Sequence, residues 1–171
     1  KNEIILPRII PVEGATESQF LFIGHDGRII RTTPGNKHIK ADFVKSFPHP
    51  LLFLTPDDCI VLALKVEGTF YKFTMDGEFL FRSDICGGQE WEDSIEREIE
   101  FVITYPSVQL RLADMFFAKN GNMYAAWGGK FKDRNTMAMM YDKNGIFIGR
   151  VFQSALYPYV PSAYTLVNDT T

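Results

Sequence analysis

Four Asp-Gly or Asn-Gly dipeptides divide the sequence, and each lies between two short apolar runs. They occur at Asp26-Gly27, Asp76-Gly77, Asn120-Gly121 and Asn144-Gly145. Such dipeptides reach positive φ at little cost, which suits the two-residue turns that connect antiparallel strands. The sequence therefore predicts four β-hairpins with two-residue turns. A fifth, weaker turn is predicted at Pro56-Asp57-Asp58.

The apolar runs between these turns have the length and composition of strands. They span four to eight residues, are rich in Phe, Ile, Val, Leu and Tyr, and are bounded by Gly, Asp, Asn and Pro. A helical spacing occurs in residues 90–101, where Ile95 and Ile99 are four positions apart. This window is predicted to be a short helix or a surface turn in a chain that is otherwise all-β.

Length and composition exclude several classes of partner. The 171 residues are 46% hydrophobic, which is enough apolar material for a core. A net charge of −3 gives no positive field to attract nucleic acid or an anionic lipid surface. No apolar run approaches the roughly 20 residues of a membrane-spanning helix. We therefore expect a single folded domain with no nucleic-acid partner and no membrane span.

The order of the turns discloses an internal repeat. Residues 51–64 (LLFLTPDDCIVLAL) resemble residues 115–127 (MFFAKNGNMYAAW), since each has a strand, a polar turn and a second strand. Residues 69–82 (TFYKFTMDGEFLFR) and 136–150 (TMAMMYDKNGIFIGR) follow as matching second hairpins that end in Arg. Each unit therefore has four antiparallel strands in up-and-down order, which is typical of a β-propeller blade.

The predicted organisation is a single β-propeller-like segment over residues 1–171 that begins and ends within a blade. Residues 20–31 resemble another second hairpin, and residues 162–168 resemble an opening strand. A β-sandwich or an open barrel is the alternative all-β arrangement. The predicted parts are a half blade at 18–33, blades at 50–83 and 113–152, and the start of a further blade at 160–168.

Two stretches of the last complete unit resemble the NHL-type and related six-bladed β-propeller repeats. They are residues 121–126 (GNMYAA) and residues 141–148 (YDKNGIFI). The resemblance covers about two thirds of the chain, and it is weaker at residues 58–61 (DCIV), where the glycine and the aromatic residue are replaced. It implies a propeller architecture and favours a periplasmic or extracellular location. It does not imply one activity, because such propellers include binding scaffolds, lyases and lactonases.

A closed propeller usually needs at least four blades, which is more than this segment supplies. Half blades at both ends would leave strand edges unpaired, and complete proteins normally cover or pair such edges. We therefore expect the remainder of a longer chain to complete the propeller. A second copy of the chain is the alternative.

Long connections on one side of the blades are the predicted place for a ligand. In an up-and-down blade the two hairpin turns lie on one side and the remaining connections lie on the other, and long loops commonly carry function. Tyr157 and Tyr159 flank Pro158 and can offer aromatic faces to a sugar or peptide. The predicted ligand-binding residues are Trp91, Tyr157, Tyr159, His38 and Arg134.

The sequence contains no recognisable catalytic or metal-binding spacing. There is no G-x-S-x-G segment, and neither Cys59 nor Cys86 has a histidine close to it in sequence. The acidic residues of 90–100 match no calcium loop, and zinc bound by His38, Asp42 and His49 is a weaker alternative. We predict no catalytic residue, metal or cofactor. The preferred function is non-catalytic binding of a protein, peptide or glycan, and the alternative is a metal-dependent lyase or lactonase-like enzyme.

Overall fold

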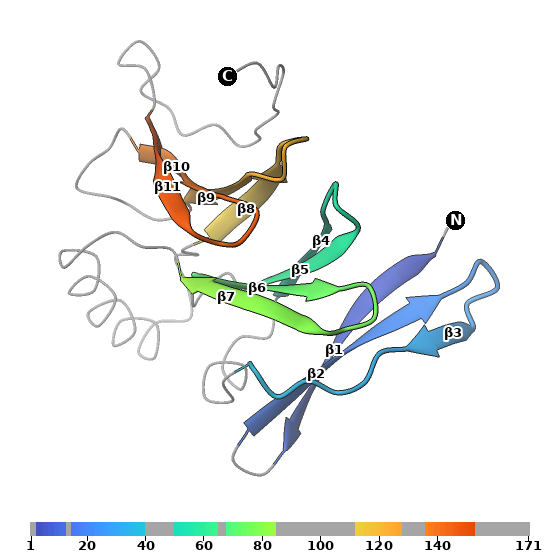
Figure 1. Cartoon of the computed structure of the whole chain (residues 1–171). Helices are drawn as coiled ribbons and strands as arrows, with labels where there is room; N and C mark the ends of the chain where they lie inside the picture. Colours follow the sequence, from blue (N-terminus) through green and yellow to red (C-terminus); the bar gives the residue numbers. More distant parts are fainter. Residues whose placement is uncertain are drawn as a thin grey trace. The chain divides into compact units, whose positions relative to one another are not determined.

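The computed structural model describes residues 3–12, 15–39, 50–64, 68–84, 112–127 and 136–152 (Figure 1). These residues form antiparallel strands and contain no helix, so the predicted all-β fold is confirmed. They include no helix long and apolar enough to cross a membrane. The strands are β1 (Ile4–Val12), β2 (Ala15–Ile23), β3 (Ile29–Thr32), β4 (Pro50–Leu54), β5 (Cys59–Leu64), β6 (Thr69–Thr74), β7 (Phe79–Asp84), β8 (Leu112–Phe117), β9 (Met123–Trp127), β10 (Thr136–Tyr141) and β11 (Phe147–Phe152).

The described strands form three sheets in which spatial order follows chain order. The first sheet contains β1 to β3, the second contains β4 to β7, and the third contains β8 to β11 (Figure 1). The second and third sheets are therefore four-stranded up-and-down meanders, as the repeat in the sequence predicts. Every strand pairs with its neighbour in sequence, so each sheet is built from successive hairpins.

Strand β1 is an addition to the half blade predicted at residues 18–33. It pairs with β2 from Ile4 opposite Ile23 to Val12 opposite Ala15. Its sequence contains Pro7, which argues against a strand at first sight. Phe20, opposite Pro7, makes its backbone hydrogen bonds to Thr33 on its other side. The backbone nitrogen of residue 7 therefore points away from β2, and a proline at this edge position costs no ladder hydrogen bond.

Five hairpin turns share one geometry, and it is not the predicted two-residue turn. In each, the first residue donates its N–H to the carbonyl of the fifth, and the fourth donates back to the carbonyl of the first, at 2.9–3.1 Å. This is a three-residue loop with a bulge, in which the fourth residue has positive φ. The turns span residues 24–28, 55–59, 74–78, 118–122 and 142–146.

The dipeptides mark these turns correctly but occupy different positions from those predicted. The type I′ two-residue turn that Asp-Gly and Asn-Gly favour needs positive φ at both members, whereas in these dipeptides only the glycines Gly27, Gly77, Gly121 and Gly145 have it, at 76° to 89°. Asp58, at 53°, is the one residue other than glycine with positive φ among those described. The fifth turn, for which the sequence gives the weakest signal, therefore has the same geometry as the other four.

The hairpins that close the first and third sheets share a second irregularity. The pairing of β2 with β3 skips Ile30, and the pairing of β10 with β11 skips Ile148. Each skipped residue is the sixth after the first residue of its turn, so both hairpins have a bulge in the same place. The residues that flank the turn then face each other, as the ring pairs Phe73–Phe79 at 5.9 Å and Tyr141–Phe147 at 5.8 Å illustrate.

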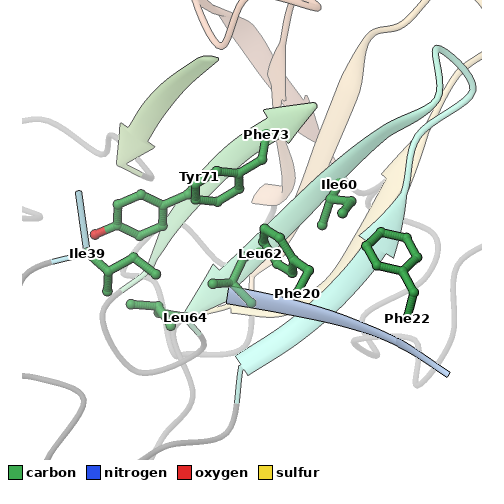
Figure 2. Packing of buried hydrophobic residues seen from close by; sticks show 8 residues of the cluster. All are labelled: Phe20, Phe22, Ile39, Ile60, Leu62, Leu64, Tyr71 and Phe73. Atoms are coloured by element: carbon green, nitrogen blue, oxygen red, sulfur yellow. The ribbon is translucent and has the colours of Figure 1, made fainter. Parts of the chain in front are cut away.

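The chain divides into two compact units, of which the first contains residues 1–64 and 70–82. Its core lies between the first and second sheets (Figure 2). Phe20 contacts Phe73 edge-on, with ring centroids 5.1 Å apart. The side chains of the core are Phe20, Phe22, Ile39, Ile60, Leu62, Leu64, Tyr71 and Phe73.

The second unit contains residues 65–69 and 83–171. One face of β9 and β10 is fully buried, as in strands packed against a core, and Ala126 and Ala138 on the opposite face are buried as well. The fully buried side chains include Met123, Ala125, Met139 and Tyr141.

Candidate functional site

His38 is the predicted ligand-binding residue that falls within the described part of the chain. Its ring stacks on Phe79 with centroids 4.0 Å apart and an interplanar angle of 13°. The residue is exposed, while its neighbour Ile39 is buried in the core of the first unit. Trp91, Arg134, Tyr157 and Tyr159 lie outside the described residues, as do His49, Asp42 and the windows 90–101 and 160–168.

Hydrogen bonds to β2 hold the segment that carries His38. Thr33 accepts the N–H of Phe20 on its hydroxyl at 2.9 Å and donates its own N–H to the carbonyl of Phe20 at 3.0 Å. Ser18 and Asn36 exchange backbone hydrogen bonds at 2.7 and 2.9 Å. The segment therefore continues the edge of the first sheet beyond the end of β3. His38 therefore follows a hydrogen-bonded segment and is exposed, with its ring stacked on Phe79.

Arg31 connects the first sheet to the turn after β6. Its guanidinium lies 3.4 Å from the centroid of the Phe22 ring and donates to the carbonyl of Met75 at 2.9 Å. Phe22 is also its cross-strand partner, whereas Arg150 pairs with Met139, one position further from its turn. The sequence comparison places both arginines at the ends of similar hairpins, but they do not occupy equivalent positions.

A polar cluster missed by the sequence analysis surrounds Lys72, in the middle of β6. The side chain of Lys72 is 3% exposed, and its ammonium donates to Oδ2 of Asp57 at 2.7 Å. The ammonium is also 6.0 Å from the centroid of the Phe81 ring. Asp57 belongs to the turn between β4 and β5, so the ion pair ties this turn to β6. The signal in the sequence is a lysine within a strand whose other residues are apolar or Thr.

Electrostatics within this cluster favour a structural role. Burial alone would raise the pKa of Asp57, but hydrogen bonds from Lys72 and Thr55 and the charge of Lys72 outweigh it and hold that pKa below its ordinary value. Burial raises the pKa of the Cys59 thiol, and the negative charge of Asp57 raises it further. Cys59 is therefore less ionised than an ordinary cysteine, which makes it a poor nucleophile.

A second polar cluster lies in the second unit, at the end of β7. Thr69 donates its hydroxyl to Oδ1 of Asp84 at 2.8 Å, and the Tyr141 hydroxyl donates to the Asp84 carbonyl at 3.1 Å. Ser83 donates its hydroxyl to the carbonyl of Gly145 at 2.6 Å. These bonds satisfy polar groups around residue 84 and form no acid–base pair.

The contact between Ser83 and Gly145 has an equivalent in the first unit. Ser83 is the ninth residue after Thr74, the first residue of its turn, and Thr33 is the ninth after Gly24. Gly145 and Gly77 are the fourth residues of their own turns. Thr33 lies against Gly77, where its Cβ would be 2.5 Å from a Cβ added to the glycine. The same two positions of the repeat therefore meet in both units.

Histidine, cysteine and carboxylate side chains do not gather in the described residues. No group of three or more of them could hold a metal ion there. The described residues thus provide a buried ion pair, hydrogen-bonded polar clusters, an exposed histidine stacked on a phenylalanine, and apolar sheet faces.

No protein-family model matches the chain, and no curated protein matches it. Among solved structures, a protein of unknown function from Bacteroides caccae is similar, with 14% sequence identity and a TM-score of 0.34. The match covers 86% of this chain and 66% of that one, so this chain spans slightly less than two thirds of that protein. None of these comparisons supports the resemblance to NHL-type repeats, which stays a prediction. The described chain is an all-β protein of successive antiparallel meanders.

Proposed function

We propose that the chain is a β-propeller-type segment that binds a protein, peptide or glycan without catalysis. Its ligand would lie on the side of the long connections. The observation that carries this proposal is the uniformity of the five hairpin turns, which assigns one end of every sheet to the same short turn. The bulge shared by the first and third sheets and the contact repeated at the fourth turn residue support a common structural repeat in the two units, as successive blades have.

The turn side chains contribute to closing their own loops. Asp26 accepts the N–H of Arg28 at 3.0 Å, and Asn120 accepts that of Asn122 at 2.9 Å. Asp142 accepts the N–H of Ile146 at 2.8 Å. The connections at the other end, such as residues 85–111 and 128–135, are longer and carry Trp91 and Arg134. A ligand site on that side agrees with the general placement of binding residues on long loops.

The chemistry of the described groups supports binding in preference to catalysis. The raised pKa of Cys59 disfavours the thiolate that a nucleophile needs. The buried Lys72 is held by Asp57 at 2.7 Å and lies beneath a turn. His38 presents an exposed imidazole on Phe79, which suits stacking on a planar or sugar ligand.

The proposal is tested with panels of immobilised oligosaccharides and peptides. A variant combining Trp91→Ala, Tyr157→Ala and Tyr159→Ala should weaken any binding at least tenfold, and His38→Ala should weaken it less. Matched controls are His25→Ala and Glu78→Ala, since both residues are exposed on the short turns. Equal losses for the two sets would contradict a site on the long connections.

Metal analysis of the dialysed protein distinguishes the proposed non-catalytic binding from the alternative, a metal-dependent enzyme. We expect less than stoichiometric Ca²⁺ and Zn²⁺ and an unchanged melting temperature after chelation. A stoichiometric metal whose removal lowers the melting temperature would overturn the non-catalytic proposal in favour of a lyase or lactonase-like enzyme.

A further inference from the structure

In each of the five described hairpin turns, one side chain accepts the N–H of the fifth residue. Where the first residue carries a hydroxyl or a carboxylate, that residue is the acceptor. This is so for Thr55 with Cys59 at 3.0 Å, Thr74 with Glu78 at 3.1 Å and Asp142 with Ile146 at 2.8 Å. These turns are therefore closed by a side chain of their first residue in addition to their two backbone hydrogen bonds.

The remaining two turns begin at Gly24 and Ala118, which have no side-chain acceptor. In both, the third residue of the turn takes this role. Asp26 accepts the N–H of Arg28 at 3.0 Å, and Asn120 accepts that of Asn122 at 2.9 Å. The side chain of the third residue is thus held against its own turn only where the first residue cannot accept the bond.

In the other three turns, the side chain of the third residue is available for other contacts. Asp57 binds Lys72 at 2.7 Å, and Asp76 lies 3.5 Å from Arg31. Asn144 is the third residue of the last turn, and it is exposed. Its Nδ2 lies 3.5 Å from Oδ2 of Asp142, and its Oδ1 accepts no hydrogen bond from any described residue.

An asparagine followed by glycine can undergo a reaction that needs no enzyme. The backbone nitrogen of the glycine attacks Cγ of the asparagine and closes a succinimide ring, and the side-chain nitrogen leaves as ammonia with the proton of the glycine N–H. Water then opens the ring. Addition at Cγ gives aspartate, and addition at the backbone carbonyl gives isoaspartate, in which the chain runs through the side chain. Glycine favours ring closure because it has no side chain to obstruct the attack.

The chain contains a matched pair of such asparagines. Asn120 and Asn144 both lie in a Lys-Asn-Gly sequence, at residues 119–121 and 143–145. Both are exposed, and the glycines that follow them have φ of 89° and 81°. Both glycine N–H groups donate to the first carbonyl of their turn, at 2.9 and 3.0 Å. The main difference between the two sites is therefore the hydrogen bond that the asparagine Oδ1 accepts at residue 120.

We propose that Asn144 is a site of this spontaneous modification and that the turn protects Asn120 from it. The side chain of Asn120 must give up its bond to Asn122 before it can rotate toward the glycine nitrogen. The side chain of Asn144 has only a 3.5 Å contact with Asp142 to lose. One net hydrogen bond corresponds to about a fivefold difference in rate.

Conversion of Asn144 would weaken the turn in which it lies. Aspartate would place a carboxylate oxygen where Nδ2 now lies 3.5 Å from the Asp142 carboxylate, and the like charges repel. Isoaspartate lengthens the backbone by a methylene group before Gly145, whose carbonyl accepts the hydroxyl of Ser83 at 2.6 Å. Aspartate at residue 120 is tolerated better, because Asp26 makes the same bond in the first sheet. We therefore expect a lower melting temperature for Asn144→Asp than for Asn120→Asp, and the opposite order would contradict this consequence.

The inference goes beyond ligand binding and does not depend on it. The first test incubates the whole chain at neutral pH and follows the exchange of an NH group for oxygen at each asparagine by peptide mass spectrometry. In the folded chain we expect conversion at Asn144 to be about fivefold faster than at Asn120. In urea the two rates should become equal, because the local sequences are alike. Equal rates in the folded chain, no conversion at Asn144, or the same ratio in urea would overturn the proposal.

The second test exchanges the acceptors of the two turns. Ala118→Thr supplies the hydroxyl that Thr55 and Thr74 provide elsewhere, so Asn120 should be converted faster, at a rate close to that of Asn144. Asp142→Ala removes the acceptor at the first position, so Asn144 should accept the N–H of Ile146 and be converted more slowly. Circular dichroism checks that both variants keep the fold. With the fold intact, an unchanged rate at Asn120 in the first variant or a faster rate at Asn144 in the second would refute protection by the side-chain hydrogen bond.

Discussion

Lys72 shows how a single buried charge can organise a hairpin turn. Its ammonium is buried and donates to a carboxylate in the turn between β4 and β5. Buried ion pairs often contribute little net stability relative to apolar replacements, but breaking one by removing one partner is costly. The aliphatic part of the lysine side chain also contributes to packing.

Two substitutions separate the charge of Lys72 from its volume. Lys72→Ala removes both the ion pair and the buried stem, and we expect a loss of about 2–4 kcal/mol in the free energy of unfolding. Lys72→Met keeps a similar volume, so the expected loss is only about 1 kcal/mol. Urea unfolding measures the free energy of unfolding of both variants. Equal losses for the two variants would mean that the charge dominates and packing does not.

Asp57 makes the stability of the first unit depend on pH. Its pKa in the folded chain lies below the ordinary value of 3.8, so the ionised carboxylate stabilises the fold above that pH. The contribution is lost as the pH falls through the folded-state pKa. We expect the difference in unfolding free energy between the native chain and Asp57→Asn to be constant from neutral pH to about pH 4 and to shrink below it. A difference that grows on acidification would contradict this assignment.

At the scale of elements, turn positions could be predicted from the sequence, but turn type could not. Asp-Gly and Asn-Gly dipeptides signal a local need for positive φ, and the structure places positive φ on each glycine. Whether the preceding residue also adopts it depends on how the two strands are paired, and a dipeptide does not encode that pairing. The turn at Asp58 has the weakest signal in the sequence, because a residue with a side chain adopts positive φ less readily than glycine.

A matched pair of glycine substitutions tests the repeated turn. Gly27 and Gly77 occupy the same turn position, with φ of 76° and 85°. An added Cβ meets nothing within 4 Å at Gly27, whereas at Gly77 it would lie 2.5 Å from the Cβ of Thr33. We expect Gly27→Ala to cost about 1 kcal/mol and Gly77→Ala to cost about 2–4 kcal/mol, measured by thermal unfolding. Equal costs would exclude the contact with Thr33.

The sequence patterns did not predict strand β1 or the Lys72 cluster, and the physical reason differs between the two. Pro7 weakens the strand pattern locally, and its place at an edge becomes evident only when the partner strand is known. The partner of Lys72 is fifteen residues away in another hairpin, so no local spacing indicates it. Of the predicted binding residues, the structure describes His38 and gives it a ring partner, Phe79, that sequence spacing does not suggest.

At the scale of the whole molecule, the sequence predicts repeated meanders because each is specified by neighbouring strands. It does not specify which sheet faces stay exposed after folding. Ile4 and Leu6 read as ordinary strand residues in the sequence. Their exposure, 61% and 45%, is known only from the structure.

The agreement of strand order with chain order has a consequence for how the protein folds. Every described strand pairs with the strand just before or after it in the chain. Each hairpin therefore closes a short loop, and the loss of chain entropy on closure is small. Proteins dominated by such local pairings fold faster than those that must join distant segments. Each meander can therefore form as soon as its own strands have been synthesised, before the later sheets exist.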